Sequence, residues 1–292
     1  MKVIYHIGLH STDEDRALRC LLRNDSLLQQ RGIVVAQPGR FRPVLREAMI
    51  QLKGQPATEE IQDHILEGIT EIDAPQRVLF SNDSFLCVPR RAIEGGVLYP
   101  LVSERAPWIR NLFPGQPTEF ALALRNPATL IPALHARFAA EENFEQYLAR
   151  LDPEALSWMN MVERLRACVP DARLIVWCNE DSPLIWPDIL QALSDLPDPM
   201  HLEGINDFIA GLMTEDGFAR LESYLDGHPA SGVAHWRKIV SAFLDKFALA
   251  DAVEEEFDLP GWSQERVSIL SERYEEDIER IVQMDGIEFL SA

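Results

Sequence analysis

The sequence predicts an α/β protein built on a parallel sheet, and three observations support this prediction. Short apolar segments alternate with helical segments through the first two-thirds of the chain. Two of them, Val78-Leu79-Phe80 and Leu174-Ile175-Val176-Trp177, are continuously apolar, which is typical of strands covered on both faces. The chain also opens with a β-branched run that ends at Gly8. This pattern predicts three layers, in which about five parallel strands are flanked by helices.

Apolar and β-branched residues concentrate in five segments, which we expect to be the strands. These are residues 2–8, 32–35, 77–81, 119–124 and 173–178. The segments between them carry apolar residues at helical spacing, as Ala17, Leu18 and Leu21 show in the first. We therefore expect helices at residues 12–30, 58–72, 128–140 and 153–167.

The last third of the chain reads differently, because no strand is expected after about residue 200. Its periodicity predicts three helices, at residues 205–225, 233–249 and 263–284. Ser263 is expected to be the N-cap of the last helix. The acidic run 251–258 is expected to be a solvated loop or helix face. We expect one domain over residues 1–292, in which a mainly helical part (201–292) packs on a sheet-forming part (1–200).

Composition and charge exclude several classes of function. The formal net charge of −20 argues against nucleic acids and anionic membranes as partners. The four cysteines show no Cys-x-x-Cys spacing, so we expect reduced thiols. No signal-peptide pattern and no apolar run of membrane-spanning length is visible, so we expect a cytoplasmic protein. A small molecule or another protein remains as the partner, and the sequence leaves the oligomeric state open.

The opening strand, turn and helix form the kind of segment that often holds a phosphate on the free amides of a helix N-terminus. The helical pattern is expected to open at Thr12, and Asp13-Glu14-Asp15 would then fill its first turn. Thr12 and Asp15 would form a capping-box-like arrangement, and the carboxylates would favour the helix dipole. Two other interpretations remain: an anion site rebuilt around arginines, and a cation site that uses these carboxylates.

Other candidate residues follow strand ends. His6 lies within the first strand, where a buried core histidine is the commoner interpretation. His10 lies in the turn at the carboxyl end of that strand, where ligands bind in open α/β sheets. Asp83 is either a general base or a turn residue, and Arg125 either binds an anion or pairs with an acidic group.

The run His6-Ile7-Gly8-Leu9-His10, followed by Thr12, resembles the opening signature of bacterial sulfotransferases, typically His-Ile-Gly-x-x-Lys-Thr-Gly-Thr-Thr. Ser11 falls on the family lysine, and Asp13-Glu14-Asp15 falls on the glycine and the last two threonines. The resemblance implies a P-loop-like fold similar to that of nucleotide kinases. It also implies 3′-phosphoadenosine 5′-phosphosulfate as the donor cofactor, provided that the altered loop still binds it.

Two weaker resemblances lie downstream. Leu79-Phe80-Ser81-Asn82-Asp83 resembles the strand end that supplies a catalytic base in many family members. Leu124-Arg125-Asn126-Pro127 resembles the corner whose arginine contacts the 3′-phosphate of the donor, although Ala133 stands where the family has a serine. The implied catalytic residues are His10 and Asp83. The implied donor-binding residues are Gly8, Ser11, Thr12, Arg16 and Arg125, and no metal ligands are implied.

Three functions are consistent with these residues. The favoured one is a sulfotransferase-like protein with a degenerate donor loop that binds a small molecule or protein without catalysis. The second is an active, divergent enzyme that transfers a sulfuryl group to a hydroxyl or amine, with Arg16 or Arg19 in place of the missing lysine. The third is a metal- or nucleotide-sugar-dependent transferase with Asp13, Asp15 and Asp83 around a divalent cation.

Overall fold

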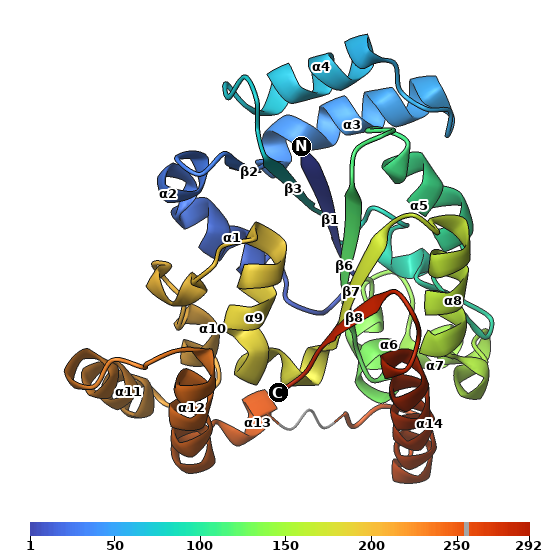
Figure 1. The fold of residues 1–292 in the computed structure, drawn as a ribbon. Coiled ribbons are helices and arrows are strands. Elements are labelled where there is room, and N and C mark those ends of the chain that lie inside the picture. The colour runs from blue at the N-terminus through green and yellow to red at the C-terminus, as the bar shows by residue number, and fades with distance from the viewer. Residues whose placement is uncertain (254–256) are drawn as a thin grey trace.

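Six parallel strands form the central sheet of the protein, in the order β2-β3-β1-β6-β7-β8. The computed structural model describes residues 1–253 and 257–292. The strands are β1 (Lys2–Gly8), β2 (Ile33–Val35), β3 (Arg77–Ser81), β6 (Thr118–Leu124), β7 (Arg173–Cys178) and β8 (Ile287–Leu290). A separate hairpin pairs β4 (Ile93–Glu94) with β5 (Val97–Leu98). Figure 1 shows helices on both faces of the sheet, so the predicted three-layer α/β class is confirmed.

Side chains alternate between two hydrophobic cores along each strand, as the period of two requires. Tyr5 and Phe120 belong to the core on one face, whereas Ile4 and Ala121 belong to the core on the other. The first core includes residues of α3 (Pro38–Leu52), α4 (Glu59–Ile69), α5 (Val102–Arg110), α6 (Pro127–Ala136), α7 (Phe144–Ala149), α8 (Trp158–Cys168) and α14 (Gln264–Val282). The second includes residues of α1 (Arg16–Arg23), α2 (Asp25–Gln29), α9 (Ser182–Ser194), α10 (Asp207–Ala210), α11 (Glu215–Gly227) and α12 (Val233–Phe247).

The expectation that strands stop after residue 200 is wrong. The chain returns from α14 to place β8 beside β7, with Leu174 opposite Ile287. β8 has only four residues, and all of them are of intermediate exposure. Its sequence therefore shows neither a continuous apolar run nor a regular alternation of apolar and polar residues. Ser263 does cap α14, since its hydroxyl accepts the Arg266 amide proton at 3.3 Å.

The single helix predicted for residues 12–30 is two helices in the structure, and the first of them begins later than predicted. α1 begins at Arg16, and the chain breaks at Asn24 before α2. The Asn24 side-chain amide donates to the carbonyl oxygens of Cys20 and Glu203, which joins this break to a distant segment.

Several further expectations concern single segments. Cys20, Cys87, Cys168 and Cys178 are free thiols. Of the acidic run 251–258, residues 254–256 lie outside the described part, and α13 (Ala250–Val253) precedes them. Within the two described ranges, no helix has both the length and the apolar content needed to cross a membrane.

The direction in which the chain leaves each strand creates a crevice at the carboxyl edge of the sheet. α1 follows β1 on one face, whereas α5 and α6, which come after β3 and β6, belong to the opposite face. Ligands of open α/β sheets bind where adjacent strands send their connections to opposite faces. The fold therefore places the loop after β1 at such a switch point.

A buried ion pair joins the start of β3 to the start of β6. It is formed by Arg77 and Glu119. Arg77 donates to Glu119 at 2.7 Å, and to the carbonyl oxygens of Leu193 and Ala192 at 2.9 and 2.7 Å. Both charged side chains are almost fully buried. Arg173 contributes a second guanidinium, 3.2 Å from the other carboxylate oxygen of Glu119.

We expect Glu119→Ala to lower the free energy of unfolding by about 3–5 kcal/mol, because it leaves the buried Arg77 guanidinium with only the more distant, exposed carboxylate of Asp195 at 3.6 Å. Urea denaturation measures this loss. Glu163→Ala, on the exposed surface of α8, is the matched control and should change stability by no more than about 0.5 kcal/mol. Equal losses in the two variants would contradict the assigned role of the pair.

Candidate functional site

A cavity of about 210 Å³ lies at the carboxyl ends of β1 and β3, and we call it the β1–β3 cavity. This volume is below the range of about 300–1,000 Å³ that is usual for ligand pockets. It equals the space of about seven water molecules at roughly 30 Å³ each. The lining residues are His6, Gly8, Leu9, Ser11, Asp13, Glu14, Asp15, Ser81, Asp83 and Arg137.

The segment from residue 9 to residue 15, which we call the β1 loop, has an unusual backbone. Four of its non-glycine residues have positive φ: Leu9 (76°), Ser11 (58°), Glu14 (49°) and Asp15 (62°). Such conformations are uncommon for residues with a Cβ atom and cost on the order of 1–3 kcal/mol each. They persist only where surrounding contacts hold them, and they cluster at functional sites.

Gly8 begins this turn because its backbone conformation favours glycine. Its φ is 59°, in the left-handed region that favours glycine. A Cβ atom at this position would lie 3.6 Å from the Cα of Asp83, an ordinary van der Waals contact, so the end of β1 lies beside the residue that follows β3. The sequence-predicted Gly8 and Asp83 are thus brought together at one wall of the cavity.

Arg125 holds the β1 loop from the side of β6. Its Nη1 donates to the Ser11 carbonyl oxygen, and its Nε donates to the Thr129 hydroxyl at 3.0 Å. The Arg125 carbonyl in turn accepts the indole proton of Trp158 at 2.8 Å. The side chain is buried and is not among the residues that line the β1–β3 cavity. Its guanidinium therefore binds the loop backbone in this structure.

Arg16 and Arg19 hold the other end of the loop in the same way. Arg16 Nη1 donates to the Asp13 carbonyl at 3.4 Å, and Arg19 Nη1 donates to the Glu14 carbonyl at 3.0 Å. Arg16 also lies over the Phe208 ring, 5.1 Å from its centroid. These two arginines therefore also bind the loop through its carbonyl oxygens.

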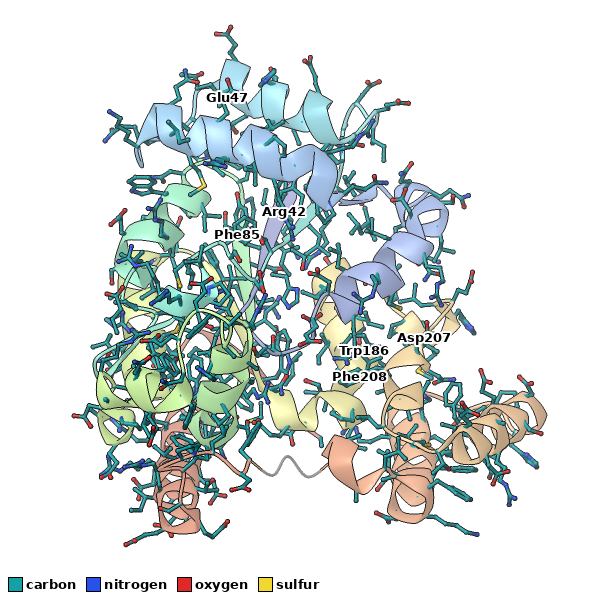
Figure 2. The ribbon with its side chains drawn as sticks, turned by 180° about the vertical axis from the view of Figure 1, so that it is seen from behind. Arg42, Glu47, Phe85, Trp186, Asp207 and Phe208 are labelled. Atoms are coloured by element: carbon teal, nitrogen blue, oxygen red, sulfur yellow. The ribbon has the colours of Figure 1, made fainter. Side chains whose placement is uncertain are left out.

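A second, smaller cavity of about 150 Å³ contains Arg16 and Arg19 in its lining. Trp186 and Phe208 stack there with ring centroids 4.8 Å apart, and Figure 2 shows them beside Asp207. Ser11 is among the residues that line the β1–β3 cavity, whereas Arg16 and Arg19 are not.

The predicted capping box at the start of α1 is wrong. Asp15 is the N-cap in a left-handed conformation without a side-chain cap, and the first turn of α1 contains no acidic residue. Asp13 caps the helix instead, since its carboxylate accepts the Ala17 amide proton at 3.0 Å. Thr12 donates to the Leu9 carbonyl at 2.8 Å and so stabilises the loop. Two left-handed residues before Arg16 displace the helix start that the local pattern predicts.

His6 is buried and forms only part of its potential hydrogen bonds. Its Nδ1 lies 2.9 Å from the Ser81 hydroxyl, and its ring stacks on Trp177 with centroids 5.9 Å apart. Burial lowers the pKa of His6, so the ring is neutral at pH 7. Its Nε2 is buried and forms no hydrogen bond with any described residue, and His6 is among the residues that line the β1–β3 cavity. The interpretation of His6 as a satisfied core residue is therefore incomplete.

His10 lies behind the loop and packs against Tyr99. Its amide donates to the Tyr99 hydroxyl at 3.0 Å, its Nδ1 lies 3.2 Å from the same oxygen, and the rings stack. The side chain is completely buried and is not among the residues that line the cavity. Burial lowers the pKa of His10 to about 4, against the opposing effect of the Asp83 carboxylate.

Asp83 is an ionised and paired carboxylate. Its Oδ2 accepts a proton from Arg137 at 2.9 Å, and its Oδ1 accepts the Ser84 hydroxyl proton at 2.8 Å. Burial acts to raise the pKa of Asp83, but the hydrogen bond from Ser84 and the guanidinium of Arg137 outweigh it and lower the pKa. These contacts favour the charged form of Asp83 at neutral pH.

The lining of the β1–β3 cavity carries more negative than positive charge. Asp13, Glu14 and Asp15 join Asp83 there, and Arg137 is the one lysine or arginine among the lining residues. Burial raises the pKa of Asp15, and the neighbouring carboxylates of Asp13 and Asp83 raise it further. Among the described residues, no group of three or more His, Cys, Asp or Glu side chains could hold a metal ion. The metal-dependent alternative therefore has no site in this part of the chain.

Sequence reasoning missed Arg137 and Tyr99. Arg137 follows α6 without any motif, and Tyr99 precedes α5 in a left-handed conformation. Only the packing of α6 and of the segment before α5 against the loop brings them to the site. Ser81 could have been found, because it follows the apolar run of β3 and immediately precedes Asn82-Asp83.

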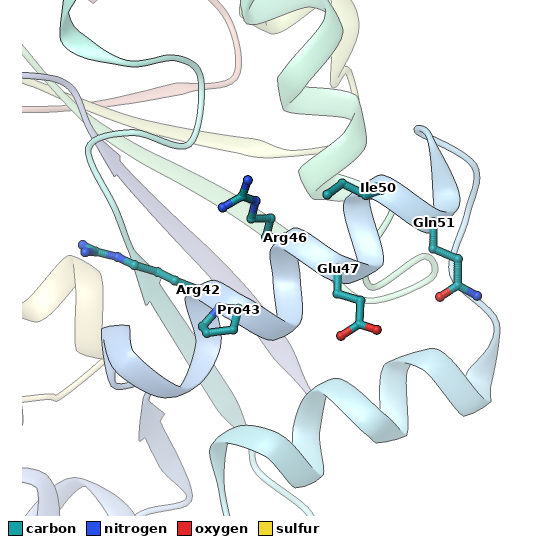
Figure 3. A pocket seen from close by; sticks show the side chains of 6 residues that line it. All are labelled: Arg42, Pro43, Arg46, Glu47, Ile50 and Gln51. Atoms are coloured by element: carbon teal, nitrogen blue, oxygen red, sulfur yellow. The ribbon is translucent and has the colours of Figure 1, made fainter.

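A broad groove on the outer surface of α3 has a volume of about 600 Å³ and is lined by this helix alone. In Figure 3, Arg42 and Arg46 extend away from Glu47, whose side chain points toward α4. Arg42 is near enough to Asp15 to act against the rise in the pKa of that carboxyl. A positive side chain therefore lies within electrostatic range of the β1–β3 cavity but is not among its lining residues.

Comparisons with known proteins reveal a structural similarity. No protein-family model matches the sequence, and no curated protein matches it. The crystal structure of a sulfotransferase from Alicyclobacillus acidocaldarius is 11% identical, with a TM-score of 0.39, over 82% of this chain and 97% of that chain. A TM-score of this size assigns neither a fold family nor an activity to the chain.

We expect the stability of the His10→Gln variant to fall less steeply than that of the wild-type protein as the pH is lowered from about 6.5 to about 4. The folded-state pKa of about 4 lies below the unfolded value of about 6.5, so only the unfolded state takes up this proton between those values. The wild-type protein therefore loses up to about 3 kcal/mol of stability as pH falls through this window, and this component is absent from the variant. Urea denaturation over the same pH range measures the difference. The exposed His64 provides the control: if His64→Gln flattens the profile equally, the burial of His10 is not the cause.

We expect Arg125→Met to loosen the β1 loop. It removes a charged hydrogen bond to the Ser11 carbonyl, a loss of about 1.5–3 kcal/mol, and releases the strained backbone. Amide hydrogen exchange of residues 9–15 should become faster, as mass spectrometry of peptides that cover the loop will show. Arg46→Met, on the exposed face of α3, should leave this exchange unchanged. Identical exchange in the two variants would rule out the holding role of Arg125.

Proposed function

We propose that this chain is a sulfotransferase-like binding protein that transfers no sulfuryl group and holds a small ligand in the β1–β3 cavity. The observation that carries the proposal is the set of bonds from Arg125, Arg16 and Arg19 to carbonyl oxygens of the β1 loop. A site for an anionic donor needs amide protons and cationic side chains directed at the phosphate. In this chain Arg125, Arg16 and Arg19 direct guanidinium protons at carbonyl oxygens of the loop itself.

The charge of the cavity supports the same proposal. Ser11 replaces the family lysine, and Asp13, Glu14 and Asp15 line the cavity. A phosphate charge about 4 Å from one carboxylate would be repelled by roughly 4 kcal/mol at an effective dielectric constant of about 20. The one guanidinium in the lining, that of Arg137, is already bonded to Asp83.

The size of the cavity supports a small ligand rather than a nucleotide. A volume of about 210 Å³ is too small to enclose an adenosine bisphosphate. Adenosine 3′,5′-bisphosphate is what the sulfotransferase donor becomes once its sulfuryl group has been transferred. The buried Nε2 of His6 provides a polar contact that a small molecule could use. Nucleic acids and membranes remain unfavoured as partners because the net charge is −20.

Calorimetric titration of the full chain with adenosine 3′,5′-bisphosphate, at low and moderate salt, tests this proposal. We expect no binding heat and no rise in melting temperature, because the loop directs carboxylates and not cations at the cavity. Micromolar binding that disappears in Arg125→Ala and persists in Arg46→Ala would contradict the proposal. That result would support the alternative, an active enzyme that moves a sulfuryl group from 3′-phosphoadenosine 5′-phosphosulfate to a hydroxyl or amine.

A further inference from the structure

We infer that the ligand of the β1–β3 cavity is a small primary ammonium compound, bound by the carboxylates of the β1 loop and by Nε2 of His6. The inference rests on the proposed function, in which the cavity holds a small molecule. Three properties of the cavity indicate the chemical class of that molecule: the negative charge of its lining, the unpaired buried Nε2 of His6 and the cavity volume.

Charge favours a cation. Among the acidic lining residues, Asp83 is paired with Arg137, which leaves Asp13, Glu14 and Asp15 without an ion pair to any described residue. Asp13 uses one carboxylate oxygen to cap α1. A bound ammonium group would reduce the repulsion among these carboxylates, whereas an anion would increase it.

The buried histidines leave this negative charge uncompensated. Burial lowers the pKa of both His6 and His10, so neither ring adds a positive charge at neutral pH. Nδ1 of His6 lies 2.9 Å from the Ser81 hydroxyl, and in the tautomer that carries the proton on Nδ1 the other nitrogen, Nε2, keeps a lone pair that can accept a proton from a ligand. That nitrogen is buried and forms no hydrogen bond with a described residue, a state that is costly unless a ligand donates to it.

An ammonium group matches these acceptors better than a metal ion does. It has three N–H donors and binds carboxylates and imidazole at hydrogen-bond distances. A metal ion would need its ligands much closer together, and the described residues contain no such group of three. The cavity volume, about that of seven water molecules, restricts the ligand to a short aliphatic amine or to the amine end of a longer molecule.

The experiment compares three probes of similar size on the full chain: n-butylamine, n-butanol and n-butyrate. Calorimetry should show saturable 1:1 binding of n-butylamine that weakens as salt is added, since the attraction is electrostatic. Binding of n-butanol should be at least about tenfold weaker, because it lacks the charge, and n-butyrate should not bind.

Variants assign the binding to the cavity. Asp15→Asn should weaken n-butylamine binding at least about tenfold, and Glu163→Gln, on the exposed surface of α8, should leave it unchanged. His6→Phe should also weaken it, because a phenyl ring retains the stacking on Trp177 but has no acceptor nitrogen. Melting temperatures show whether the variant at the buried His6 still folds. If it does not, n-butylamine binding by Asp15→Asn, a change at a half-exposed position, decides whether the ligand binds in the cavity.

The failure of this inference is distinguishable from the failure of the proposed function. Absence of n-butylamine binding, equal affinity for n-butanol, or unchanged affinity in Asp15→Asn would overturn the ammonium assignment alone. Binding of adenosine 3′,5′-bisphosphate that requires Arg125 would overturn the proposed function as well.

Discussion

Bonds from arginine side chains to the carbonyl oxygens of the β1 loop determine the shape of the whole candidate site. Arg125 reaches the loop from β6, whereas Arg16 and Arg19 reach it from α1. Guanidinium groups carry several N–H donors in a rigid plane, so they suit this role. The left-handed residues of the loop need such support, because each costs on the order of 1–3 kcal/mol.

The held loop also sets the electrostatics of the cavity. Its left-handed turns place acidic side chains, from Asp13 to Asp15, in the lining beside the buried ring of His6. Burial keeps His6 and His10 neutral, so the one cation in the lining is Arg137, already bonded to Asp83. Groups with perturbed pKa values in a concave site at a topological switch point are typical of functional sites.

The sequence predicted most of the sheet because buried parallel strands carry a strong local signal. The runs in β3 and β7 are apolar throughout, and the structure covers both of their faces. β8 gave no such signal, since it is short, half-exposed and stabilised by pairing with β7. Edge strands of this kind depend on tertiary contacts more than on composition.

The candidate site was predictable in location but not in geometry. The glycine that ends β1 and the polar residues after β3 indicated the carboxyl edge of the sheet, and Gly8 and Asp83 do meet there. The capping rule failed at Thr12 because Glu14 and Asp15 adopt left-handed conformations, which move the start of α1 to Arg16. The roles of Arg137 and Tyr99 arise from long-range packing, which no local pattern contains.

The strand order has a consequence for how the chain reaches its folded state. β1 pairs with β3 and β6, so Lys2 lies opposite Arg77 and Val3 lies opposite Thr118, while Leu174 lies opposite Ile287. Such pairings join segments far apart in the sequence, and the entropy of closing those loops is lost before the contacts form. We therefore expect slow folding, during which unpaired strand edges and apolar runs such as that of β7 are exposed. Refolding at high protein concentration should then favour aggregation over the native sheet.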